Sequence, residues 1–395
     1  MTAPEREHAP AVPPTVKGLA LVSLFNDFAS EMVYPLLPAF ISRTLGGSAT
    51  LIGALDGAAD LTSAALKWVS GRLADRPGWR RPLILVGYAT AVLVRPLISF
   101  ASAAWQVIGF RVIDRVGKGI RTPPRDALIA EVTPPEVRGR SYGFHRAADH
   151  FGAVVGSLAA WYLLRSGANV RSVIEWSIVP GIVAFVTLAF ILRRRGGPAR
   201  PAPAARGATD ADGRVFWAPV IALAMLVLAR VPEALILLRL QDLGVPVATI
   251  PLVWAALHVV RSGGSYPGGK LTDRMGPRAT VAAGAVVFAA VVGALGLRLT
   301  EGEAIGVFLA FGLVAGLTES AERAMVARLA PVKTGKGFGA YHALTGLAAL
   351  PAGVLFGALY QRLGGVAFGV SAGAVLLAAA GWTVVAPRGE MAERS

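Results

Sequence analysis

Cysteine is absent from the 395-residue sequence, and charged residues are few. Without a thiol, the chain forms no disulfide, thiolate metal site or cysteine nucleophile. Charged residues make up 16% of the chain and hydrophobic residues 54%, whereas about 25% of an ordinary soluble protein is charged. The composition therefore excludes an ordinary soluble globular protein. Because a membrane-spanning helix needs about 20 apolar residues, it predicts a polytopic membrane protein with about a dozen spans.

Acidic residues are also scarce, at 24 against 39 Lys and Arg, for a net charge of +15. In a soluble protein this excess would suggest nucleic-acid binding, but Lys and Arg also accumulate in the cytoplasmic loops of membrane proteins. We therefore predict a lipid bilayer, and no nucleic acid, as the partner. Residues 1–16 are polar and proline-rich. They lack the basic run and short apolar segment of a signal peptide, so no cleaved signal is expected.

Twelve apolar stretches predict an all-α membrane protein with two sets of six spanning helices. The first set lies near 17–42, 49–70, 82–102, 105–131, 141–164 and 173–192, and the second near 215–239, 246–266, 279–298, 304–329, 338–361 and 365–386. Basic residues concentrate in the connections after even-numbered stretches, which places both termini in the cytoplasm. The predicted parts are a cytoplasmic tail (1–16), a bundle (17–192), a flexible cytoplasmic linker rich in Pro, Gly and charge (193–214), a second bundle (215–386) and a cytoplasmic tail (387–395).

The two halves repeat each other in sequence. Gly-x-Leu-x-Asp-Arg-x-Gly-x-Arg follows the second stretch, and the same pattern with Lys after the first Gly follows the eighth, at an offset of 273 − 75 = 198. Pro134 likewise faces Pro331, and His145 faces His342, both at an offset of 197. A fixed offset over several motifs indicates a duplicated six-helix unit.

The paired loop segments resemble the loop motif of the major facilitator superfamily, and the resemblance covers residues 15–388. It implies a secondary transporter of two pseudo-symmetric bundles that rock about a central site. Segments 27–35 and 118–130 are similar to a poorly characterised prokaryotic branch, which indicates no substrate. In the fifth helix, Ser157 follows Gly156, where the antiporter motif of the superfamily has proline.

In the loop motif, the aspartate can cap or pair with a neighbouring helix end while the arginines latch the bundles in one conformational state. The alternative is that these are ordinary cytoplasmic charges that end two helices. The predicted conformational-switch residues are Gly71, Asp75, Arg76, Gly78, Arg80, Gly269, Asp273, Arg274, Gly276 and Arg278.

Charged residues within predicted spans are costly, so each is a candidate for function. In the fourth stretch, six of them fall within an arc of about 120° on one helix face: Arg111, Asp114, Arg115, Lys118, Arg121 and Arg125. They predict either an anion-attracting wall or internal ion pairs that hold the bundle together. Pro123 and Pro124 lack N–H donors and should break or kink the helix near Gly119.

The first stretch places Asp27 and Glu31 one turn apart, where their mutual repulsion would favour binding of a proton. The same pair could instead ligate a cation or form static ion pairs. His145, Asp149 and His342 are the other proton-coupling candidates, and we expect the two histidines to share a cavity. The remaining cavity candidates are Arg230, Glu319, Glu322 and Arg323, with Arg230 and Glu233 as a local pair or a cross-helix brace.

Asp56, Asp60 and Lys67 form one stripe on the second stretch. It predicts either a brace between bundles or a gate at the cavity mouth, with Arg95 as partner of one of these carboxylates. No catalytic set, phosphate-cradling loop or metal-ligand spacing is found, so we predict neither an enzyme nor a bound cofactor or metal.

We predict a monomeric, proton-coupled transporter of a small anion in the cytoplasmic membrane, with export favoured over uptake. The alternatives are efflux of amphipathic cations or of a metal complex and, from another class, a non-transporting membrane sensor or binding protein. Because aromatic residues make up only 8% of the chain, a dedicated aromatic drug pocket is disfavoured.

Overall fold

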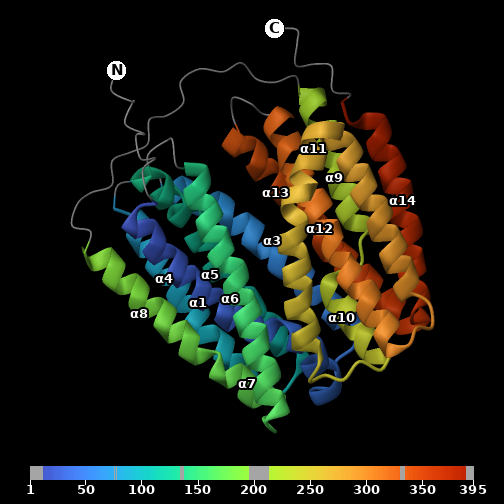
Figure 1. The fold of residues 1–395 in the computed structure, drawn as a ribbon, viewed down its shortest axis with the longest axis horizontal. Coiled ribbons are helices and arrows are strands. Elements are labelled where there is room, and N and C mark those ends of the chain that lie inside the picture. The colour runs from blue at the N-terminus through green and yellow to red at the C-terminus, as the bar shows by residue number, and fades with distance from the viewer. Residues whose placement is uncertain are drawn as a thin grey trace, which may run out of the picture.

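The computed structural model describes residues 12–74, 76, 78–133, 138–194, 213–329 and 334–387, and helices make up nearly all of this part. The prediction of an all-α protein is confirmed for these residues. Most of the predicted linker and tails lies outside them. α1 begins and α14 ends at the same end of the molecule, with the first half of the chain on one side and the second half on the other (Figure 1).

The first half begins with α1 (Pro14–Val33), which continues through the short turns η1 (Tyr34–Leu36), α2 (Leu37–Ala39) and η2 (Phe40–Thr44). The next elements are α3 (Ala49–Ala74), α4 (Arg80–Leu97), η3 (Ile98–Phe100), α5 (Ala104–Val132) and α6 (Arg138–Arg165). α7 (Val170–Trp176) and α8 (Ile178–Arg194) complete this half.

The second half contains α9 (Gly213–Ala229), α10 (Glu233–Asp242), α11 (Ile250–Leu295), α12 (Glu301–Leu329), α13 (Thr334–Leu363) and α14 (Val366–Val385). α11 contains two of the predicted helices, and its backbone leaves the helical conformation at Gly276. Gly276 has φ 80°, and its repeat counterpart Gly78 has φ 82°. Because this left-handed region favours glycine, the two loop motifs turn the chain in the same way.

Proline explains why one predicted helix is split into α9 and α10. Pro232 precedes α10 with φ −71° and ψ 153°, outside the helical region. The break leaves backbone groups without helical partners, and Ser371 of α14 satisfies two of them. Its hydroxyl donates to the Ala229 carbonyl at 2.8 Å and accepts from the Val231 N–H at 3.0 Å. An interrupted helix at membrane depth is thus stabilised by a neighbouring helix.

Within the described part of the chain, six helical segments are long and apolar enough to cross a membrane by length and composition: Arg80–Phe100, Val170–Arg193, Phe216–Asp242, Arg274–Leu295, Gly339–Leu363 and Val366–Val385. The count of twelve spans and the cytoplasmic position of both termini stay predictions. The charged helices α1, α3, α5 and α6 pack side by side within the first half, with α1 against α6 and α3 against α5 (Figure 1).

The two halves meet mainly where α3 packs on α13 and α6 packs on α11. A Cβ added to Gly53 of α3 would lie 2.0 Å from the carbonyl oxygen of Gly353 of α13. The two backbones are therefore in direct contact, which only glycine permits at this point. Near the end of the same contact, the Thr50 hydroxyl donates to the Gln361 side chain at 2.9 Å.

Candidate functional site

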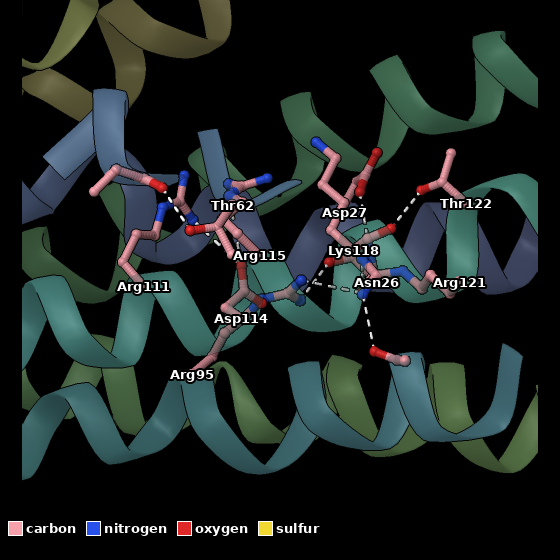
Figure 2. Close-up of polar contacts among 12 residues, drawn as sticks. Asn26, Asp27, Thr62, Arg95, Arg111, Asp114, Arg115, Lys118, Arg121 and Thr122 are labelled. Carbon is pink, nitrogen blue, oxygen red and sulfur yellow. Dashed lines mark hydrogen bonds and ion pairs between the residues drawn. The ribbon is translucent and has the colours of Figure 1, made fainter. Parts of the chain in front are cut away.

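One face of α5 carries a buried ion-pair network (Figure 2). The Nε of Arg95 in α4 lies 2.9 Å from the Asp114 carboxylate, and these side chains are 5% and 2% exposed. Arg111 approaches the other carboxylate oxygen at 3.6 Å and Arg115 at 3.8 Å. One carboxylate thus faces three guanidinium groups. Arg95 pairs with Asp114, whereas the sequence predicted a partner among the carboxylates of α3.

Asn26 of α1 connects this network to Arg121. Its backbone carbonyl and side-chain oxygen accept hydrogen bonds from Arg95 at 2.9 and 3.2 Å. The same side-chain oxygen accepts from Arg121 at 3.4 Å, and Arg121 also donates to the Gly87 carbonyl at 3.0 Å. Arg111, Asp114 and Arg121 are therefore buried and have their polar partners within the first half. For these residues the structure agrees with internal ion pairing, one of the two alternatives predicted from the sequence.

α5 continues through Pro123 and Pro124, where the sequence predicted a break or kink near Gly119. Pro123 has no N–H to donate to the Gly119 carbonyl four residues earlier. The hydroxyl of Ser70 in α3 donates to that carbonyl at 2.8 Å instead. This interhelical bond explains how a continuous helix tolerates the proline pair.

A cavity of about 290 Å³ opens between α3 and α5 of the first half and α9 and α13 of the second. Three of its lining side chains are cations, Lys67, Arg115 and Lys118, and one is the carboxylate Asp60. The other lining residues are Ser63, Ala64, Val227, Tyr341, His342, Thr345, Gly346 and Ala349. The cavity therefore combines excess positive charge with hydroxyl and imidazole groups, which suits a small anion.

Lys118 has few close partners of opposite charge. Its side chain is exposed towards the cavity. The positive charges of Arg115, Lys67 and Arg121 repel the Lys118 ammonium group. Asp27 is the carboxylate that attracts it most strongly. Lys118 and Asp27 lie close together in Figure 2, while Arg121 reaches Asn26. The six residues predicted on one face of α5 are thus divided: Arg115 and Lys118 line the cavity, and Arg111, Asp114, Arg121 and Arg125 do not.

The proton-coupling candidates fall into separate places. Asp27 accepts a hydrogen bond from Asn26 at 2.9 Å and interacts electrostatically with Asp149. Asp149 lies 3.5 Å from Nδ1 of His145, which is 3% exposed and does not line the cavity. His342 does line it. The two histidines therefore do not share this cavity.

Glu31 of α1 reaches the other half of the molecule. Its carboxylate accepts a hydrogen bond from Nε1 of Trp254 at 2.9 Å and lies 3.9 Å from Nε2 of His258. Both partners belong to α11. Glu31 thus forms a contact between halves, separate from Asp27.

Further polar contacts brace helices across the molecule. Asp56 accepts bonds from the Tyr34 hydroxyl at 2.9 Å and from the Ala234 N–H of α10 at 3.0 Å. Arg230 lies 3.6 Å from Glu322 of α12, and Glu322 also accepts from the Tyr341 hydroxyl at 2.5 Å. Glu233 pairs with Arg261 of α11. Arg230 and Glu233 therefore contact different helices rather than each other. On α3, Asp56 connects the first half to α10 of the second, whereas Asp60 and Lys67 face the cavity.

The loop-motif residues have unlike partners in the two halves. Arg80 pairs with Glu131 of α5 at 2.6 Å, whereas its counterpart Arg278 donates to the Thr383 carbonyl of α14. Arg76 and Arg274 are exposed. Gly71 lies in the last turn of α3 and Gly269 within α11. Asp75 and the side chains of Asp273, Glu319 and Arg323 lie outside the described residues.

A sequence profile of the Major Facilitator Superfamily matches residues 19–238 and 231–395. The chain belongs to the major facilitator superfamily. An uncharacterized MFS-type transporter of Methanocaldococcus jannaschii is 26% identical over 359 residues, which cover 87% of each protein. Multidrug resistance protein MdtH of Proteus mirabilis is 31% identical over 134 residues, which cover 34% of this chain and 33% of MdtH.

Among solved structures, a D-xylose–proton symporter superposes with a TM-score of 0.74 at 13% identity, covering 94% of this chain and 97% of that one. At this identity the likeness establishes the fold. Members of the superfamily are multi-pass membrane transporters of small molecules and are generally not enzymes. The major facilitator fold places the cavity of this protein between its two halves.

Several residues of this major facilitator site escaped the sequence analysis. Asn26, Trp254 and Tyr341 are polar side chains on largely apolar helices, and their partners are far away in the sequence. His258 was not among the proton-coupling residues predicted from the sequence. Its position one turn after Trp254 in the same predicted span is a sequence signal that could have singled it out.

Proposed function

We propose that this protein is a secondary active transporter that moves a small anion by alternating access. The observation that carries the proposal is the placement of Lys67, Arg115 and Lys118 around a cavity between the two halves. Cations concentrated in a low-dielectric cavity attract anions. A site shared by two halves can open to either side of the membrane when they rock against each other.

The proposal includes the proton as coupling ion and no resident cofactor. Carboxylates and histidines lie close to the cavity cations, as in the pair of Asp27 and Lys118. One of the solved structures with a similar fold is that of a D-xylose–proton symporter, which supports the proposal of proton coupling. We further propose a monomer in the cytoplasmic membrane, with export as the direction, on the partial similarity to MdtH.

The test is a ligand-induced thermal shift of the purified protein at pH 6 and pH 8. The probes are phosphate, sulfate and small mono- and dicarboxylates, compared with ethidium and tetraphenylphosphonium as amphipathic cations. We expect an anion to raise the unfolding midpoint and Lys118→Gln to reduce its affinity about tenfold, the value of one charged hydrogen bond. Lys17→Gln is the matched control, because Lys17 is exposed near the start of α1 and away from the cavity.

Efflux of amphipathic cations is the second candidate, and the similarity to MdtH over 134 residues is what favours it. Stabilisation by ethidium or tetraphenylphosphonium alone, lost in Glu31→Gln, would replace the anion proposal by this one. In that case, the cations of α5 would serve only as an internal scaffold.

A further inference from the structure

The contact between Glu31 and His258 joins α1 of the first half to α11 of the second. The Glu31 carboxylate lies 3.9 Å from Nε2 of the imidazole, and the two side chains are 19% and 13% exposed. This distance is too long for a hydrogen bond and short enough for an ion pair. A small movement would therefore convert it into a direct N–H···O bond.

Both ring nitrogens of His258 are buried and make no hydrogen bond within the described part of the chain. Buried polar atoms are normally hydrogen-bonded, so an unpaired imidazole next to a carboxylate requires an explanation. Protonation supplies one, because an imidazolium ion has two donors and a positive charge to place against Glu31. Neutral imidazole leaves the contact without a bond whenever the proton sits on Nδ1.

The charged and titratable groups that act on His258 are Glu31 of α1, Glu233 of α10, Arg261 of α11 and His150 of α6. Arg261, one turn further along α11, pairs with Glu233 of α10, so these two charges largely offset each other. His150 of α6 is a second titratable group, with its ring centre 6.3 Å from that of His258. The ring of Trp254 meets the His258 ring edge to face, with 5.3 Å between the ring centres. Glu31 is thus the carboxylate placed to accept a hydrogen bond from protonated His258.

We propose that His258 and Glu31 together form a proton-binding site across the interface between the two halves. A proton from solvent binds an imidazole nitrogen, and the resulting N–H donates to the Glu31 carboxylate. Because the partners lie on different halves, this bond can form in the present conformation, where they are 3.9 Å apart, and is lost when the halves rock apart. Proton binding and conformation are therefore linked, and each favours the other.

The role of this site in transport rests on the proposed function, whereas the linkage of the proton to conformation does not. The absence of cysteine makes the linkage measurable, since spin labels can be attached to introduced cysteines alone. Phe144 of α6 and Met275 of α11 are 45% and 51% exposed and lie on opposite halves. Phe144→Cys with Met275→Cys gives a label pair whose distance distribution reports the arrangement of the halves.

The experiment measures this distance distribution by pulsed electron spin resonance between pH 5 and pH 8, in lipid nanodiscs without substrate. We expect acid to favour the present conformation, with the ratio of the two populations changing by up to about tenfold per pH unit for one linked proton. His258→Gln and Glu31→Gln should each flatten this dependence to less than twofold. His258→Lys, which carries a fixed charge, should hold the present conformation at every pH.

His150→Gln and His342→Gln are the matched controls, because they remove other histidines without removing the Glu31 contact. A pH dependence that survives in both His258→Gln and Glu31→Gln would overturn the proposal, as would its loss in His150→Gln alone. If the populations follow His258 while phosphate, sulfate and carboxylates fail to bind, the proton site stands and the proposed anion transport falls. If an anion binds while His258→Gln leaves the titration intact, the opposite holds.

Discussion

Arg95 and Asp114 form a buried ion pair at 2.9 Å between α4 and α5. The same carboxylate also lies within 4 Å of Arg111 and Arg115. Removing one partner of a buried pair leaves uncompensated charge inside the protein, which costs about 3–5 kcal/mol. Asp114 is thus the residue that holds the cationic face of α5 against the rest of the first half.

Asp114→Asn is therefore expected to destabilise the protein by about 3 kcal/mol or more, because three guanidinium groups lose their common carboxylate. The measurement is the thermal unfolding midpoint in detergent. Glu301→Gln, at the exposed start of α12, should leave the midpoint nearly unchanged and serves as the control. Equal midpoints for Asp114→Asn and wild type would show that the network contributes no stability.

The bond from Ser70 to the Gly119 carbonyl leads to a second prediction. Ser70→Ala leaves that buried carbonyl without a donor and should cost about 1–3 kcal/mol. Pro123→Ala restores the backbone N–H that a helix normally supplies, so the same serine substitution should cost clearly less in that background. A double-mutant cycle of unfolding midpoints measures the difference. Additive effects would mean that the serine acts in another way.

The direct backbone contact of Gly53 with Gly353 leads to a third prediction. Gly53→Ala would place a Cβ 2.0 Å from the Gly353 carbonyl oxygen, so α3 and α13 would have to move apart. We expect the population of the present conformation to fall in the spin-label experiment, with the helices themselves intact by circular dichroism. Gly306→Ala is the matched control, since its Cβ would meet no atom within 4 Å. An unchanged distance distribution in Gly53→Ala would contradict this view of the interface.

The fold was largely predictable from the sequence because the signals for it are local and repeated. Apolar stretches located the helices, and the loop motif at a constant offset identified the duplication. Gly78 and Gly276 bear this out with nearly equal positive φ angles. The division of α9 from α10 was missed because the predicted stretch near 215–239 is apolar on both sides of Pro232, and the break is compensated by Ser371 of a distant helix.

The site was less predictable, since a helical face does not reveal its neighbours. Asp114 and Arg115 are adjacent in sequence and point about 100° apart, so one turns into the bundle and the other lines the cavity. The repeat is no guide here either. At an offset of 197, Lys118 corresponds to Ala315 and Arg121 to Thr318, so the cationic face exists in only one half.

The most direct test of the account is uptake of the stabilising anion into proteoliposomes under an imposed pH gradient. The account predicts anion flux that follows the gradient in the wild type and in Lys17→Gln, and about tenfold weaker apparent affinity in Lys118→Gln. Equal flux and affinity in Lys118→Gln and wild type would contradict it, because the cavity cations would then take no part in binding the transported solute.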